Sequence, residues 1–503
     1  MAAGGSDRRL HHHWRSSSKP RDEAARRDSQ SASQPLGRHC RRAGAEAQSD
    51  PGGVFHGGVV FRLSDAAVED GPEFRRPRHR RQLCGGDSAG EVRAERTGEP
   101  AALAGRLAGG CRRGVVGAVI YLIALACAVT ACYQIAALVA SWRHLRRRPP
   151  AGGWTPGVSL LKPVRGVEPW FEEAVRSHAT QDYPEFEILF AAGAPDDPAV
   201  GVIRKVMAER PSAPIRILVG ATRAPNGKVG LLVDAAREAR YPILLVNDAD
   251  IAVPPDYLRT VVAPLEDPRC ALVTCLYRAR ASSLPGWWEA LGIAADFAPG
   301  VLVAPLVGVR EFGLGATLAF RAADLARIGG FEAIAGYLAD DYQLAKRLTR
   351  LGGRAILSTT VVETATGGET WSGVWKHQVR WARTIRVSRP GGYSGLPVTH
   401  SGVWALLAAA AGCWTMALAV CALRIMAGWA AGWMVLGSKA VRRGWPLIPL
   451  WDLWAFAVWL AGLAGATVEW RGRRLRIGKD GRILTEEPLS RGTFSSKDKP
   501  EKG

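Results

Sequence analysis

Apolar residues gather in three long runs that flank a block of shorter ones. Residues 114–140 are almost all apolar and exceed the length of about 20 residues that a helix needs to cross a bilayer. Residues 402–423 and 445–468 are also long enough, whereas 425–436 is too short to span alone. The pattern predicts one transmembrane helix at 114–140 and further transmembrane helices within 402–470.

The block between these runs alternates short β-rich stretches with helical ones. The β-rich stretches are VSLL at 158–161, FEILFAA at 186–192, IRILVG at 215–220 and PILLVND at 242–248. This alternation predicts a doubly wound, mainly parallel α/β sheet within a catalytic domain at 150–400. Ligands of such sheets bind at the carboxyl ends of the strands, and four acids follow such ends: Asp196, Asp197, Asp248 and Asp250.

Residues 1–105 are rich in Arg, Ser, Gly and Ala, with little apolar periodicity. They are predicted to form a disordered, basic N-terminal extension.

The chain has 66 Lys and Arg against 46 Asp and Glu, a net charge of +20. Basic clusters follow the apolar runs, as RHLRRR at 143–148 and WRGRRLRIGK at 470–479, which favours contact with membrane lipids over nucleic acid. The first cluster predicts a multi-pass protein of the cell (inner) membrane whose catalytic domain faces the cytoplasm. Two later crossings would return residues 471–503 as a basic cytoplasmic tail, although four basic residues would then face outward: Arg424, Lys439, Arg442 and Arg443.

Ionisable residues also occur inside apolar stretches. Asp296 lies between two of them and Asp452 lies within the last long run. Such residues are usually paired or functional, but the sequence names no partner for Asp452.

The VNDADI stretch at 246–251 places Asp248 and Asp250 directly after a buried type of strand. Carboxylates at this spacing can share Mg²⁺ or Mn²⁺ with a diphosphate, because Mg²⁺ takes one or two protein carboxylates and completes its shell with water and phosphate oxygens. Asp pairs after strands are also common in ordinary turns.

The stretch LADDYQLAKRL at 338–348 opens a helical pattern with Asp340 and Asp341. Acids at a helix N-terminus are favourable in themselves. The functional interpretation is that one of them is a general base that removes a proton from an acceptor hydroxyl.

HQVRWARTIR at 377–386 belongs to an amphipathic helix that is suited to the membrane interface. An Arg on such a helix usually reaches out to water or lipid phosphate. Arg380 could instead bind a diphosphate.

Several motifs occur together and in one order between about residues 158 and 471. They are SLLKPVRGVEPWFEEAVRSHATQDYPEFEILFA, DDPAV, NGKV, NDADI, LVTCLYR, GATLAFR, GGFEAIAGYLADDYQLAK and HQVRWARTIR. Together they resemble the ceramide glucosyltransferase family, including its bacterial relative, the hopanoid-biosynthesis glycosyltransferase.

The resemblance implies a GT-A nucleotide-sugar fold and an inverting transfer of a hexose from UDP-glucose or UDP-N-acetylglucosamine to a lipid hydroxyl. The acceptor would be ceramide or a hopanoid polyol similar to bacteriohopanetetrol. By motif, Asp248 matches the family's second Asp. Asp341 matches the third, for which the resemblance implies the role of general base. Arg380 and Trp381 end the (Q/R)xxRW signature.

The chain departs from the family pattern at two positions. Ala194 stands where the first Asp is expected, with Asp196 and Asp197 just beyond as the candidates for the uracil side. His377, which with Arg380 and Trp381 is expected to bind the nucleotide sugar, occupies the first position of the signature, where the family has Gln or Arg.

Three further residues are expected to border the nucleotide, because similar enzymes place these positions there: Lys162, Pro163 and Lys228. For Lys228 a solvated surface lysine is the alternative interpretation.

Two other functions fit parts of the pattern. A polysaccharide synthase shares the sheet and the acidic motifs, but a polymer channel normally needs more spans than this sequence offers. The second alternative function is that of a membrane-tethered binding protein, which would hold nucleic acid with its basic extension. Against it, the extension lacks interleaved aromatic residues, and the acidic cluster would repel phosphates without a cation.

Overall fold

The computed structural model describes residues 99–148, 153–366, 370–470 and 473–488. Their centre is a seven-stranded sheet with the order β3-β2-β1-β4-β6-β5-β7. The strands are β1 (Val158–Val164), β2 (Phe186–Ala192), β3 (Ile215–Val219), β4 (Ile243–Val246), β5 (Cys270–Arg280), β6 (Leu318–Arg321) and β7 (Arg354–Ala365). Only β6 runs antiparallel to its neighbours within this sheet, so the sheet is mixed and mainly parallel.

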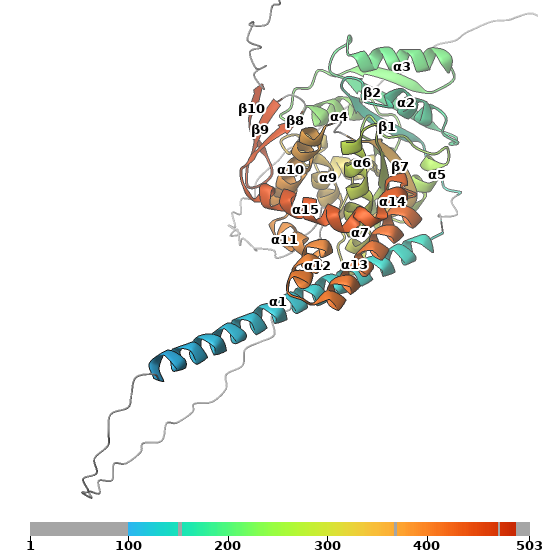
Figure 1. Ribbon diagram of the computed structural model, residues 1–503. Coiled ribbons are helices and arrows are strands. Elements are labelled where there is room, and N and C mark those ends of the chain that lie inside the picture. The colour runs from blue at the N-terminus through green and yellow to red at the C-terminus, as the bar shows by residue number, and fades with distance from the viewer. Residues whose placement is uncertain (1–98, 149–152, 367–369, 471–472, 489–503) are drawn as a thin grey trace, which may run out of the picture. The chain divides into compact units, whose positions relative to one another are not determined.

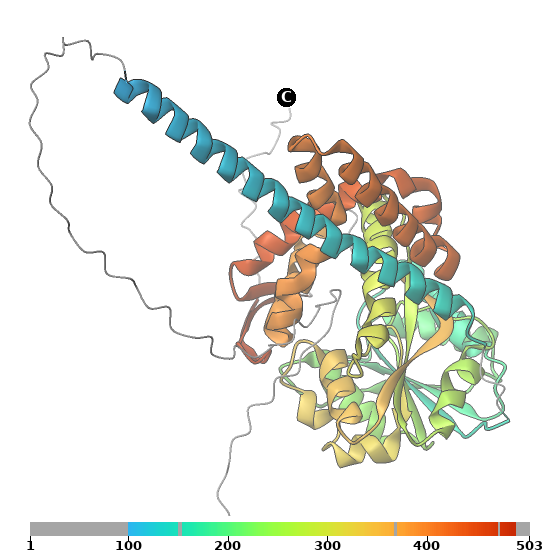
Figure 2. The ribbon, with the colours of Figure 1, turned by 90° about the horizontal axis from the view of Figure 1, so that it is seen from below.

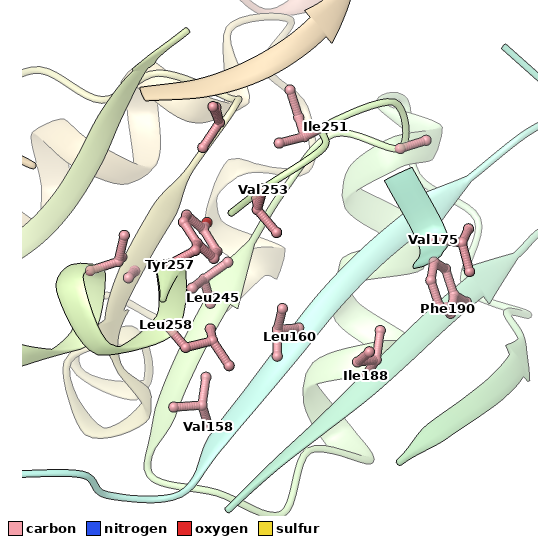
Figure 3. Close-up of a cluster of buried hydrophobic side chains, with 14 of the residues drawn as sticks. Val158, Leu160, Val175, Ile188, Phe190, Leu245, Ile251, Val253, Tyr257 and Leu258 are labelled. Atoms are coloured by element: carbon pink, nitrogen blue, oxygen red, sulfur yellow. The ribbon is translucent and has the colours of Figure 1, made fainter. Parts of the chain in front are cut away.

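Both faces of the sheet are buried, which is why its strands are nearly continuous apolar runs. Successive residues of a strand point to opposite faces, so Leu160 and Leu161 of β1 belong to different core clusters. Figure 3 shows one of these clusters, in which Leu160 and Ile188 lie beside Leu245 and Leu258.

Helices cover the two faces of the sheet in two sets. Side chains of α2 (Phe171–Ala179), α3 (Pro198–Glu209) and α5 (Tyr257–Val262) join the first core cluster. Those of α4 (Gly227–Arg237), α8 (Ala322–Arg327) and α9 (Asp340–Thr349) join the cluster on the other face. The α/β fold predicted from the sequence is therefore confirmed.

The remaining helices are mostly apolar. They are α1 (Glu99–Leu145), α6 (Leu284–Gly292), the π-helical turn η2 (Ile293–Phe297), α7 (Ala298–Val303), α10 (Trp371–Ser388), α11 (Pro390–Gly395), α12 (Ser401–Ala410), α13 (Trp414–Trp429), the π-helical turn η6 (Ala430–Val435), α14 (Lys439–Gly444) and α15 (Ile448–Leu463). Short 3₁₀ turns are η1 (Ala263–Glu266), η3 (Ala304–Val307), η4 (Phe331–Ile334), η5 (Leu396–Val398) and η7 (Trp445–Leu447). The long helix α1 packs against α7, α12 and α13 (Figure 2).

Four helical segments of the described chain are long and apolar enough to cross a membrane. They are Gly117–Leu145, Leu284–Val307, Trp414–Val435 and Lys439–Leu463. The first overlaps the run at 114–140, while the second was not predicted as a span. Most of the second segment is buried inside the protein.

The structure corrects the boundaries of the two C-terminal runs. The run 402–423 is not one helix, because Gly412 adopts a left-handed φ of +80° and separates α12 from α13. The apolar helix that starts at Trp414 instead continues through the stretch 425–436. The run 445–468 ends as a helix at Leu463, and residues 467–470 form a strand.

The predicted basic tail at 471–503 is partly folded. A three-stranded antiparallel sheet joins β8 (Thr467–Trp470), β9 (Arg473–Ile477) and β10 (Ile483–Pro488) (Figure 1). Of the predicted N-terminal extension at 1–105, residues 1–98 lie outside the described part of the chain, and α1 already begins at Glu99.

Arg424 does not face outward as the sequence suggested. It is fully buried and forms an ion pair with Asp452, the residue for which the sequence named no partner. Asp296 accepts a hydrogen bond from the indole of Trp451 at 3.2 Å.

Candidate active site

A cavity of about 830 Å³ lies at the carboxyl end of β4, between α9, α10 and the segment that contains α6 and η2. Eight of the residues singled out in the sequence line it: Lys228, Asp248, Asp250, Asp340, Asp341, His377, Arg380 and Trp381. They come from four separate stretches of the chain. The fold therefore brings the three main motifs to one place.

Asp248 and Asp250 follow β4 on a turn that is held in place by the hydrogen bonds of the preceding residue, Asn247. The fully buried side chain of Asn247 donates to the hydroxyl of Tyr257 at 2.9 Å and to the carbonyl of Ala316 at 2.6 Å. The backbone N–H of Asp248 donates to the carbonyl of Gly315 at 3.2 Å. These bonds anchor the backbone from which both carboxylates project.

The two carboxylates have different surroundings. The side chain of Asp248 is 43% exposed. Asp250 is held by the hydroxyl of Thr364 at 2.5 Å and by the N–H of Ala365 at 2.8 Å, both on the same carboxylate oxygen. Burial raises the pKa of Asp250 above its usual value, although the hydrogen bond from Thr364 opposes the rise.

Lys228 connects the two acidic motifs. Its Nζ lies 2.8 Å from Oδ1 of Asp248 and 3.0 Å from Oδ2 of Asp340. Asn226 caps α4 and thereby fixes the backbone of Lys228 at the start of the helix. Burial alone would lower the pKa of Lys228, but the carboxylates of Asp248 and Asp340 outweigh it and raise the pKa. Lys228 is therefore a cation held between acids, not a solvated surface lysine.

Asp340 and Asp341 open α9 as the sequence predicted, but they are not equivalent. Asp340 is buried and ion-paired with Lys228. Burial raises its pKa, and the charge of Lys228 opposes that effect. Asp341 is only partly buried, and one of its oxygens accepts from the N–H of Tyr342 at 2.7 Å.

Helix α10 supplies the third motif. His377 and Trp381 lie one turn apart with ring centroids 4.7 Å from each other, and Arg380 lines the cavity beside them. The ring of Trp381 also packs against Phe297, which comes from η2. This side of the cavity is thus aromatic, in contrast with the acidic side at β4.

Four of the predicted site residues do not line the cavity. Lys162 and Pro163 lie within β1, and Lys162 is fully buried beneath the site, where its Nζ donates to the carbonyl of Asp248 at 3.2 Å. Burial lowers the pKa of Lys162 to about 7. Asp197 caps α3 and accepts from the N–H of Gly166 at 2.8 Å, and Asp196 precedes it.

Glu289 on α6 lines the cavity and was missed by the sequence analysis. Its side chain is fully buried, and it contacts His377 and Gln378 of α10. The available signal was an acid within an apolar stretch, WWEALGIAADF at 287–297, which is the same signal that pointed to Asp296.

The carboxylates fit a divalent cation only if a ligand completes its coordination shell. No cluster of three or more His, Cys, Asp or Glu side chains suited to a metal occurs in the described ranges. Asp248 is accessible, and its contact with Lys228 uses Oδ1 alone. The contacts of Asp250 with Thr364 and Ala365 both use Oδ2. One oxygen of each carboxylate therefore lies outside these contacts. Such a pair suits Mg²⁺ or Mn²⁺ shared with phosphate oxygens.

Known proteins resemble part of this chain. Ceramide glucosyltransferase 1 of Caenorhabditis elegans is 31% identical over 207 residues, which are 41% of this chain and 44% of that protein. Ceramide glucosyltransferase of Komagataella phaffii is 31% identical over 113 residues, 22% of each chain. The matched regions therefore cover less than half of these relatives' own length.

Among solved structures, a mannosyltransferase from Pyrobaculum calidifontis in complex with GDP-Man and Mn²⁺ is 24% identical, with a TM-score of 0.42. The match covers 68% of this chain and 97% of that one. Residues 122–483, which include every residue that lines the cavity, match glycosyl transferase family 21. The chain belongs to glycosyl transferase family 21.

Proposed function

We propose that this protein is a membrane enzyme that transfers a hexose from a UDP-sugar to the hydroxyl of a lipid, either ceramide or a hopanoid polyol. One observation supports this most directly. A single cavity joins the acidic cluster at β4 to aromatic and apolar side chains from α10 and from Leu284–Val307, a segment apolar enough for a membrane. A polar donor and a lipid acceptor need such a pair of surfaces at one reaction centre.

In the proposed mechanism Asp341 acts as the general base. It takes the proton of the acceptor hydroxyl while that oxygen attacks the anomeric carbon from the side opposite the diphosphate. The bond from the anomeric carbon to the diphosphate oxygen breaks, the diphosphate leaves with the electron pair, and the anomeric configuration inverts. Asp340 is the less suitable base because it is buried and bound to Lys228.

The leaving diphosphate would meet the cationic groups that line the cavity. Lys228 and Arg380 can both donate to phosphate oxygens there. A Mg²⁺ or Mn²⁺ ion on Asp248 and Asp250 would neutralise further charge on the leaving group. Lys228, already held by two carboxylates, keeps its proton throughout the physiological pH range.

We also propose that the catalytic domain faces the cytoplasm, where UDP-sugars are made. The basic residues that follow α1, Arg146 to Arg148, support this orientation through the positive-inside rule. Roles for Lys162, Pro163, Asp196 and Asp197 are proposed only as support of the nucleotide side, because none of them lines the cavity.

Membranes that contain the full chain test the proposal. They would be incubated with labelled UDP-glucose or UDP-N-acetylglucosamine, with and without added ceramide or hopanoid polyol, and extracted into organic solvent. The proposal expects label in the lipid extract only when a matching acceptor is present. Membranes with equal amounts of Asp248→Asn are the control. Label in a polymer that solvent does not extract would indicate a polysaccharide synthase instead, and no transfer from either donor would refute the proposal.

A further inference from the structure

Glu289 and His377 form a hydrogen-bonded pair in the wall of the cavity. Nδ1 of His377 lies 2.5 Å from Oε1 of Glu289, and Nε2 of Gln378 donates to the same oxygen at 2.9 Å. The two partners come from different helices, α6 and α10. One carboxylate oxygen thus receives both contacts.

The second carboxylate oxygen is the unusual one. Oε2 of Glu289 is buried and has no hydrogen-bond partner among the residues that the structure describes. A buried carboxylate oxygen without a donor costs free energy, and natural proteins keep few such groups. Glu289 moreover lies within Leu284–Val307, where apolar residues would pack at no such cost. The arrangement therefore suggests that a donor from outside the protein completes the site.

The surroundings of the pair indicate what kind of donor it meets. The cavity wall around Glu289 and His377 carries Tyr277, Ile293, Phe297 and Trp381, so a largely apolar molecule can lie there. The phosphates of a nucleotide would be repelled by Glu289, while a hydroxyl or amide N–H on a lipid head group would be attracted. Of the two cations proposed to bind phosphate, Lys228 lies on the acidic side at β4, whereas Arg380 lies on α10.

We propose that Glu289 binds the head group of the lipid acceptor through a donor other than the reacting hydroxyl, and that it orients His377 beside it. Oε2 accepts a hydrogen bond from a second hydroxyl or an amide N–H of the acceptor. Oε1 holds the imidazole by Nδ1, which leaves Nε2 of His377 available to the same head group. This inference rests on the proposed transfer to a lipid and adds a specificity: acceptors with a second donor near the reacting hydroxyl are preferred over simple alcohols.

The test compares Glu289→Gln with the wild-type chain in membranes, using two acceptors. One is a lipid with a second hydroxyl or an amide, and the other is a long-chain alcohol with a single hydroxyl. A hydrogen bond to a charged group changes affinity by roughly 10- to 100-fold. We expect KM for the first lipid to rise by about that factor, KM for the alcohol to change little, and KM for the UDP-sugar to stay the same. A purely structural role would weaken all three alike.

Variants of His377 provide a second, independent test in case Glu289→Gln fails to fold. His377→Gln keeps a side chain that can donate to Oε1 of Glu289 and should retain most of the preference, whereas His377→Ala should lose it. Glu332→Gln, at an exposed ion pair with Arg237, is the matched control for loss of a carboxylate.

The outcomes separate this inference from the proposed function. If wild-type membranes glycosylate no lipid, the proposed function fails. If they do, but Glu289→Gln keeps the wild-type preference for the two-donor lipid, or loses UDP-sugar and lipid affinity equally, the acceptor role of Glu289 is refuted.

Discussion

Arg424 and Asp452 face each other through two nitrogens and two oxygens inside the apolar helices. Nη2 of Arg424 lies 2.7 Å from Oδ1 of Asp452, and its Nε lies 2.9 Å from Oδ2. The remaining Nη1 donates to the carbonyl of Ala295 in η2 at 2.7 Å, and Asp452 also accepts from the N–H of Gly402 at 2.8 Å. The pair thus ties α13, α15 and α12 to the turn that forms one wall of the cavity.

Removing one partner of this pair should be costly. Asp452→Leu leaves the guanidinium of Arg424 buried without its counter-ion, which typically destabilises a protein by about 3–5 kcal/mol. We expect a clearly lower unfolding temperature in detergent micelles, measured by intrinsic Trp fluorescence. The double variant Arg424→Met with Asp452→Leu should recover much of the loss, because no charge remains buried.

Arg443→Met is the matched control for the pair, since Arg443 is exposed at the end of α14. It should unfold at nearly the wild-type temperature. A single Asp452→Leu variant as stable as wild type would show that the pair contributes nothing to stability.

Gly315 supports the position of Asp248 by lacking a side chain. A Cβ at Gly315 would come 2.9 Å from Oδ2 of Asp248, closer than such contacts normally allow. Because the obstructing atom ends a movable side chain, Gly315→Ala should fold but displace the carboxylate. A misplacement of this kind can lower turnover by about a hundredfold.

Transfer assays at equal membrane levels would measure this effect. Gly201→Ala is the control, since a Cβ at that exposed position of α3 meets no atom within 4 Å. Full activity of Gly315→Ala would argue against a requirement for the observed position of Asp248.

The proposed roles of Asp341 and Asp248 differ in their effects on binding. Asp341→Asn preserves shape but removes basicity, so it should lower lipid glycosylation by about 10²–10⁴-fold with UDP-sugar affinity nearly unchanged. Asp248→Asn should weaken metal-dependent binding of the UDP-sugar itself. Calorimetric titration of both purified variants distinguishes them. Equal loss of nucleotide binding would place Asp341 in the diphosphate site and make Asp340 the candidate base.

Dependence on a metal ion is a separate expectation. Without a cation, Asp248 and Asp250 would face the diphosphate as like charges. Excess EDTA should therefore abolish turnover of the purified protein, and added Mg²⁺ or Mn²⁺ should restore it. Full activity in EDTA would leave Lys228 and Arg380 as the groups that hold the phosphates.

Lys162 should make stability depend on pH. Its pKa is lowered by burial to about 7 in the folded protein, whereas an unfolded lysine titrates near about 10.4. Between these values the unfolded chain binds a proton that the folded chain does not, so this group raises the free energy of unfolding as pH rises through that window. Below about pH 7 both states are protonated and its contribution is flat.

Lys162→Met removes this titration. The unfolding temperature of wild type minus that of Lys162→Met should therefore increase between about pH 7 and pH 9. A difference that stays constant over that interval would mean that Lys162 remains charged in the folded state.

Four of the seven strands of the central sheet, β1 to β4, could be predicted because buried strands leave a direct mark in the sequence. FEILFAA at 186–192 became β2 without a change of boundary. The break at Gly412 was missed because hydropathy does not register a left-handed backbone conformation within an apolar run. In β9 the buried Leu475 and Ile477 alternate with arginines, but the local charge suggested a tail instead of a strand.

The site was predictable where its residues share a short motif. Asp248 with Asp250, and Asp340 with Asp341, are close in sequence and follow a strand or open a helix. Contacts such as that of Glu289 with His377 join residues 88 positions apart, and no local pattern records them.

The pairing of β5 with β6 restricts how the chain can meet the membrane. Val273 and Ala319 are partners in one sheet, and the segment Leu284–Val307 lies between them in sequence. Because a sheet occupies one side of a bilayer, the chain must leave and return on that side, so the number of crossings between the two strands is even. One helical segment cannot supply two crossings, so Leu284–Val307 does not cross the bilayer, in agreement with the burial of most of this segment inside the protein. Its Ile293 and Phe297 line the cavity, so the same segment that stays on one side of the bilayer also forms part of the cavity wall.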